Sequence, residues 1–153
     1  MKRLLLAVPA AVLLAAPAQA ATTMRLDGIG PLDLNMSQSA AISTGWLSNR
    51  TAGCKLGGKP FPVSFQLNGK EAPKAIKGNA EFNGGKLTTL TATAGVRTAG
   101  GVQPGKTTWA GMVSRYRNAG FKVSARYDDV FQGTFVHVKR QGEAVMTGFA
   151  ETK

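Results

Sequence analysis

Residues 100–107 could do chemistry, because they match the phosphate-binding loop pattern GxxxxGK[ST]. In such a loop the backbone N–H groups cradle phosphates, the lysine reaches the outer phosphates and the hydroxyl holds magnesium. A phosphate-binding loop follows a buried apolar strand, whereas residues 87–96 are polar at every second or third position. No apolar run ending in Asp stands ready as a second magnesium ligand. We therefore interpret residues 100–107 as a turn that leads into a helix, and we expect no cofactor.

A second combination with possible chemistry is Cys54 with His137, the only cysteine and the only histidine of the chain. A Cys–His nucleophile needs a third group that orients the imidazole ring. Asp128 or Asp129 could supply it, but the Asp-Asp pair is typical of a turn. One histidine and one distant cysteine cannot fill a tetrahedral metal shell. These residues predict no catalytic site and no metal site, so we expect the protein not to be an enzyme.

The element that follows the glycine-rich segment is predicted to be a helix that begins after Thr107 or Thr108 and ends before Gly120. Its apolar residues recur at i, i+3, i+4 and i+7, which places them on one buried stripe: Trp109, Met112, Val113 and Tyr116. Thr107 or Thr108 can cap the first turn. Gly120 suits the left-handed position that ends a helix.

Residues 1–20 have the pattern of a secretory signal peptide. Lys2 and Arg3 precede the apolar run 4–16, and Ala18-Gln19-Ala20 is a small-x-small cleavage site. The run is short for a bilayer span. We expect cleavage near Ala20, a secreted or cell-wall-associated protein, and one mature domain over 21–153.

The mature chain is strongly basic. Removal of Lys2 and Arg3 leaves 17 basic and 8 acidic residues, a net charge of +9. A basic exported protein is expected to associate with polyanions such as cell-wall polymers or anionic lipid surfaces. A dispersed, solubilising charge is the alternative. Aromatic residues do not alternate with basic ones in a nucleic-acid motif, so no specific nucleic-acid partner is predicted.

An exported domain with one thiol cannot form an internal disulfide. Cys54 would be either buried and inert or paired with Cys54 of a second copy in a homodimer. It lies in a stretch with the composition of a loop, which leaves its exposure open.

The remaining elements are predicted to be a short helix and several strands. Ser37 can cap the helix, which covers 38–44, and Gly45 can end it. The strands expected are 61–67, with Pro62 demoting it to an edge, 75–82, 87–93, 121–127, 130–138 and 144–150. Asn68-Gly69, Asn83-Gly84-Gly85 and Asp128-Asp129 are the turns expected between them.

The two halves have the same predicted layout. An offset of 70 places Gly30 on Gly100, Ser37 on Thr107 and Trp46 on Tyr116. The expected fold class is therefore α+β, with two tandem helix-plus-three-strand repeats over about 28–94 and 96–150. We expect one continuous antiparallel sheet, or two abutting ones, with both helices packed on one face.

Leu32-Asp33-Leu34-Asn35-Met36-Ser37, then Thr44-Gly45-Trp46-Leu47, with Cys54 beyond, resembles a pattern in small exported actinobacterial proteins of unassigned function. The layout is similar to each repeat of the β-lactamase inhibitor protein family, and more distantly to the SmpA/OmlA envelope lipoproteins. The resemblance implies a sheet with a concave contact face. The inhibitor family has a disulfide in each repeat, and Cys54 has no partner here, so no inhibitory residue is carried over.

Basic residues are dense in the second half and could share the open face of its sheet. The contact surface expected from alternation and charge consists of Arg126, Phe135, His137, Lys139 and Arg140. A solvated polar face is the alternative. We expect a secreted, non-catalytic binding module for a protein or an acidic polymer, with an inhibitor-like role among the candidates. The alternatives are an envelope protein held by basic charge and, third, a small secreted enzyme.

Overall fold

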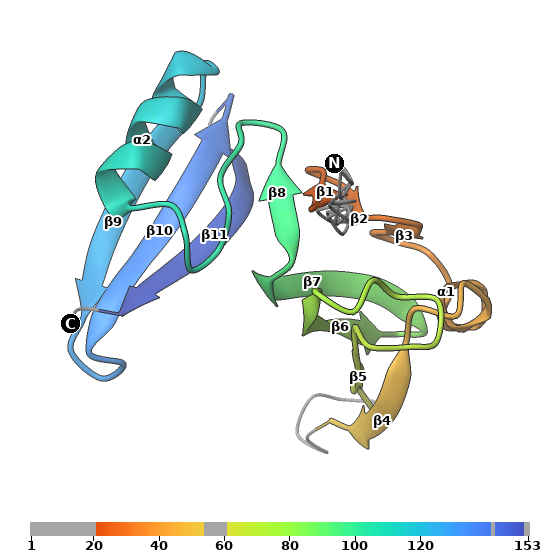
Figure 1. Cartoon of the computed structure of the whole chain (residues 1–153). Helices are drawn as coiled ribbons and strands as arrows, with labels where there is room; N and C mark the ends of the chain where they lie inside the picture. The colour runs from red at the N-terminus through yellow and green to blue at the C-terminus, as the bar shows by residue number, and fades with distance from the viewer. Residues whose placement is uncertain (1–20, 54–60, 142, 152–153) are drawn as a thin grey trace, which may run out of the picture.

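The computed structural model describes residues 21–53, 61–141 and 143–151 (Figure 1). The signal peptide predicted over 1–20 and Cys54 lie outside these residues. In the described chain the helices are α1 (Gln38–Ser43) and α2 (Trp109–Asn118). The strands are β1 (Thr22–Met24), β2 (Gly28–Ile29), β3 (Leu32–Asp33), β4 (Ser48–Ala52), β5 (Val63–Gln66), β6 (Lys77–Asn83), β7 (Lys86–Ala94), β8 (Val96–Thr98), β9 (Lys122–Asp128), β10 (Gly133–Arg140) and β11 (Glu143–Glu151).

The α+β prediction is wrong, because the protein is mostly β, with 47% strand and 14% helix. Its strands form three sheets in the described part of the chain, with the orders β3-β2-β1-β8, β4-β5-β6-β7 and β11-β10-β9. Neither one continuous sheet nor two equal repeats is present. The short α1 is followed by four paired strands, whereas the longer α2 is followed by three. The two halves therefore differ in layout.

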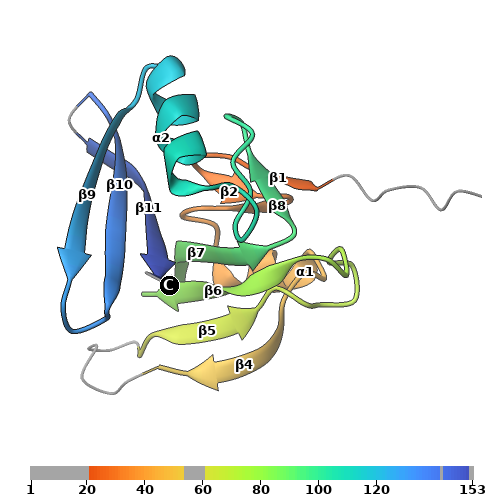
Figure 2. The ribbon, with the colours of Figure 1, turned by 60° about the vertical axis from the view of Figure 1, so that its left-hand side comes forward.

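Residues 22–98, which we call the N-terminal body, bring two of these sheets around one core (Figure 2). Strand β8 pairs in parallel with β1, which opposes Thr22 to Val96. Alternation along β5 and β6 turns Val63, Phe65 and Phe82 inward. The core residues are Ile29, Leu32, Ala41, Val63, Phe65, Leu67, Ile76, Ala80, Phe82, Leu87 and Val96.

Strand β5 differs from the expected edge strand because it lies between β4 and β6. Pro62 precedes the strand, so its missing N–H removes no hydrogen bond from the ladder. The carbonyl of Pro62 accepts from the N–H of Gly53 at 2.6 Å. Strand β4 itself was not expected, since Ser48–Ala52 has no apolar alternation; its pairing with β5 defines it.

The turn predictions had different outcomes. Gly84 and Gly85 have φ of 58° and 74° between the paired residues Asn83 and Lys86, which confirms a tight hairpin turn. The hairpin expected at Asn68-Gly69 is wrong, because β6 begins only at Lys77. A Cβ on Gly69 would lie 2.2 Å from the carbonyl oxygen of Gly45, so this glycine permits a close backbone approach instead.

Residues 99–151, which we call the C-terminal unit, consist of α2 and the sheet β11-β10-β9. The Thr108 hydroxyl accepts from the N–H of Gly111 at 3.2 Å, and Gly120 follows the helix with φ of 82°, which confirms both predicted ends. Tyr116 is buried with Val138. Trp109 was expected in the core but is 42% exposed, because it occupies the first helical position, where fewer neighbours cover it.

Candidate functional site

The glycine-rich segment 100–107 uses its backbone groups for its own turns. The N–H of Gly101 donates to the carbonyl of Thr98 at 2.8 Å. The N–H groups of Lys106 and Thr107 both donate to the carbonyl of Gln103 at 3.2 and 3.0 Å. The Thr107 hydroxyl accepts from the Gln103 N–H at 2.9 Å. The segment thus has the form predicted, a turn that leads into a capped helix.

Strand register brings most of the predicted contact residues onto one side of the sheet β11-β10-β9. Arg126 lies opposite Phe135, and Lys122 lies opposite Lys139. Residues 136 and 138 of β10 point to the other side, where Val136 and Val138 are buried. We call the side that carries Phe135, His137 and Lys139 the outer face.

Arg140 does not belong to the outer face. It follows Lys139 by one residue, and successive side chains of a strand point to opposite sides. Its guanidinium carbon lies 6.0 Å from the centre of the Phe121 ring, and Phe121 packs against the core cluster of the C-terminal unit. The five-residue surface expected from the sequence is therefore divided between two faces.

His137 lies in the middle of the outer face, half-buried, between Ser124 and Thr147 on the neighbouring strands. Its Nδ1 atom is 3.5 Å from the Thr147 hydroxyl. Asp128, considered above as an orienting group, instead accepts from the N–H groups of Val130 and Phe131 at 3.0 and 3.1 Å. Across the described chain, no three His, Cys, Asp or Glu residues gather as metal ligands would.

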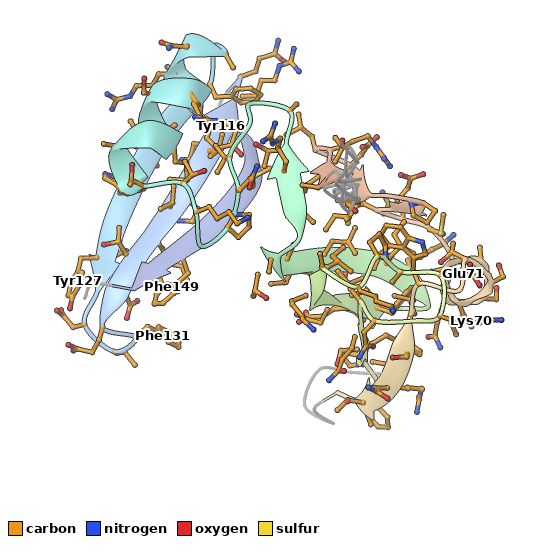
Figure 3. The ribbon with its side chains drawn as sticks, viewed as in Figure 1. Lys70, Glu71, Tyr116, Tyr127, Phe131 and Phe149 are labelled. Atoms are coloured by element: carbon orange, nitrogen blue, oxygen red, sulfur yellow. The ribbon has the colours of Figure 1, made fainter. Side chains whose placement is uncertain are left out.

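An exposed apolar group at one end of this sheet was missed in the sequence. Its members lie in the β9–β10 turn and the adjoining strand ends: the exposed Tyr127, Val130, Phe131 and Phe149, together with the half-buried Phe135. Figure 3 shows Tyr127, Phe131 and Phe149 at this end. Val130 is 85% exposed and Phe131 is 63% exposed. The ring centres of Phe131 and Phe135 are 5.7 Å apart and those of Phe135 and Phe149 are 5.0 Å apart, so three rings form one row. We call these five residues the aromatic end.

The aromatic end was not predicted, because Val130 and Phe131 were expected to belong to a strand over 130–138. Strand β10 begins at Gly133 instead, and Gln132 before it has φ of 50°, a left-handed conformation. Gly133, inside the strand expected over 130–138, was the signal available, since glycine is depleted in strand interiors and often marks an irregularity there.

Basic side chains border the aromatic end. The ion pairs among the described residues are those of Arg25 with Asp27, at 3.2 Å, and with Asp33. Lys122, Arg126 and Lys139 therefore have no carboxylate partner in that part of the chain. Lys122 and Lys139 are direct cross-strand neighbours, an arrangement of like charges that destabilises a sheet. The outer face thus keeps its positive charge available.

The opposite side of the sheet is held by Tyr116 of α2. Its hydroxyl donates to the sulfur of Met146 at 3.1 Å. Burial raises the pKa of Tyr116 from its ordinary value of 10.0, and a hydrogen bond with Thr98 acts in the opposite direction. This buried contact fixes the helix against the strands that present the outer face.

An open hollow of ≈ 380 Å³ in the N-terminal body includes Val63 and Phe82 in its lining. Phe61, Arg50 and Gln38 also line it. Gln38 and Arg50 are the polar side chains of this lining, so the convergent polar groups typical of a ligand site are missing from it. The hollow is a weaker candidate than the outer face.

No helix in the described residues is long and apolar enough to cross a membrane. Comparison of the chain with protein-family profiles, curated proteins and solved structures gave no match. The likeness to the β-lactamase inhibitor repeats therefore stays a prediction.

Proposed function

We propose that this protein is an exported, non-catalytic binding module that holds an anionic partner on the C-terminal unit. The observation that carries the proposal is the row of Phe131, Phe135 and Phe149, with Arg126 directly opposite Phe135. Large contiguous apolar patches on a protein surface mark interaction sites. Aromatic residues and Arg are also enriched in binding interfaces.

The charge of the mature chain supports an anionic partner. Its net charge is +9 once Lys2 and Arg3 are removed. Lys122, Lys139 and Arg126 add local positive charge without a carboxylate within 4.0 Å in the described chain. Such a field attracts anionic partners and raises their rate of association.

The proposal is tested by immobilising the mature chain and capturing partners from the envelope fraction and culture supernatant of the cells that make it. The expected result is a retained component that is lost with Phe131→Ser. Phe61→Ser is the matched control, because Phe61 is 41% exposed but lies on the N-terminal body. Retention that is identical in both variants, or no retention at low and physiological salt, would contradict the proposal.

A second candidate is retention in the envelope by charge alone. It is favoured by the basic residues that have no ion pair in the described chain, which lie in both halves of the molecule. Charge-held protein leaves the envelope as salt rises, because salt screens exposed charges. Retention by charge alone would also be unchanged by Phe131→Ser, whereas binding through the proposed contact surface would be lost.

A further inference from the structure

We propose that the anionic partner is a phospholipid surface, and that the β9–β10 turn enters its interface; this inference rests on the proposed function. The apolar residues occupy both sides of the sheet end. Phe135 and Phe149 are cross-strand partners on the outer face. Tyr127 is the partner of Thr134, the residue before Phe135, so it points to the opposite side of the sheet, the side on which α2 packs. Val130 and Phe131 lie in the turn that joins the strands.

This two-sided arrangement favours a partner that surrounds the end. Figure 3 shows Tyr127, Phe131 and Phe149 together at one end of the sheet, away from the part that α2 covers. A flat partner would contact one side and leave the other apolar side in water. A lipid interface covers both sides and the tip at once, and aromatic side chains are favoured at that level of a membrane.

With the β9–β10 turn in the lipid interface, the basic residues of the sheet lie at the distances from the turn that place them beside the lipid headgroups. Arg126 adjoins Tyr127 and opposes Phe135, next to the apolar group. Lys139 and its neighbour Lys122 lie four residues further from the turn than Phe135, about 13 Å along the strand at about 3.3 Å per residue. With the turn in the interface, these cations face the anionic headgroups, which attract Lys and Arg near the surface.

The acidic residues of the turn limit how deep it enters. Asp128 accepts from two backbone N–H groups of the turn and so holds its shape. Asp129 is exposed beside Val130, and its carbonyl, rather than its carboxylate, accepts from the Gln132 amide at 2.6 Å. An exposed carboxylate at the tip opposes both an anionic surface and an apolar interior. Contact is therefore shallow, and Asp129 tunes its strength.

The test is cosedimentation of the mature chain, residues 21–153, with vesicles of phosphatidylcholine alone or with about one third phosphatidylglycerol. Binding is expected only to the mixed vesicles. Phe131→Ser and, separately, Val130→Ser should weaken it at least about tenfold, since each removes an apolar side chain from the interface. Phe61→Ser should stay within about twofold, and Asp129→Asn should tighten binding about two- to fivefold.

Each other outcome overturns the inference. If Phe131→Ser and Val130→Ser bind mixed vesicles as tightly as the unsubstituted chain does, the attraction is due to charge alone. Equal binding to phosphatidylcholine removes the anionic requirement. If vesicles fail to bind while envelope capture is still lost with Phe131→Ser, the partner is a protein or polymer and the proposed function stands. If both assays fail, the proposed function falls as well. Circular dichroism of each variant checks that these exposed substitutions leave the fold intact.

Discussion

The N-terminal body and the C-terminal unit use their large apolar residues differently. Among the described residues, the body buries eleven apolar side chains in one cluster, whereas the cluster of the C-terminal unit holds three: Val102, Tyr116 and Val138. The unit nevertheless has five phenylalanine and tyrosine residues outside that buried set, and Tyr127, Phe131 and Phe149 are among the exposed ones. The main buried core of the described chain therefore lies in the body, while the unit leaves more of its large apolar side chains in contact with solvent. Removing a core residue from each region tests that division.

Phe82→Ala should have the largest effect on stability. Phe82 is 1% exposed and packs edge-to-face on Phe65, with ring centres 5.6 Å apart. The lost burial and the cavity left behind should cost about 3–5 kcal/mol in the free energy of unfolding. Urea denaturation followed by circular dichroism measures it. Phe61→Ala is the control and should cost less than about 1 kcal/mol. Similar losses in both variants would contradict the assignment of the main core to the body.

Tyr116→Ala should cost about 3 kcal/mol, but its effect should be local. Tyr116 joins α2 to Val138 and Val102, and none of these residues belongs to the core cluster of the body. Hydrogen exchange should accelerate in α2 and β9–β11 while the amides of β5–β7 stay protected, because the regions open as separate units. Equal acceleration in β5–β7 would show that the two cores unfold together and would remove the basis of the comparison.

The contribution of Tyr116 to the alkaline pH dependence of stability should be the smallest effect. Since burial raises the pKa of Tyr116, the unfolded chain loses this proton first as pH rises through its ordinary value of 10.0. The contribution of Tyr116 is therefore complete below about pH 10 and is lost above it as the pH rises through the folded-state pKa. Chemical denaturation at pH 8 and pH 11 measures the loss, and Tyr116→Phe should make it smaller. If Tyr116→Phe loses as much free energy of unfolding between pH 8 and pH 11 as the unsubstituted chain does, another group causes the loss.

Local sequence signals predicted the ends of both helices correctly. Ser37 caps α1 through a hydrogen bond from the N–H of Ala40, and Thr108 caps α2 in the same way. Gly45 and Gly120 both take left-handed conformations after their helices. The capping hydrogen bonds join residues three positions apart, and the glycine conformations are local. Short stretches of sequence are therefore sufficient to predict these helix ends.

The candidate site was predicted only in part. Period-two alternation was sufficient to place Arg126, Phe135, His137 and Lys139 on one face, but Arg140 lies on the other. The exposure of Val130 and Phe131 could not be read from their types, because apolar residues between two strands are normally expected to be buried. Their exposure depends on where β10 begins and on how much of the sheet α2 covers.

What the sequence alone determined was therefore short-range: helix caps, the Gly84-Gly85 turn and the alternation of strand faces. The tertiary structure decided the rest. The parallel pairing of β1 with β8, the place of β4 beside β5 and the division into three sheets join segments far apart in the chain. Such pairings depend on which surfaces are buried together, and a local pattern that fits several partners does not specify that choice. For the same reason the aromatic end became visible only when the strands that present it were assembled.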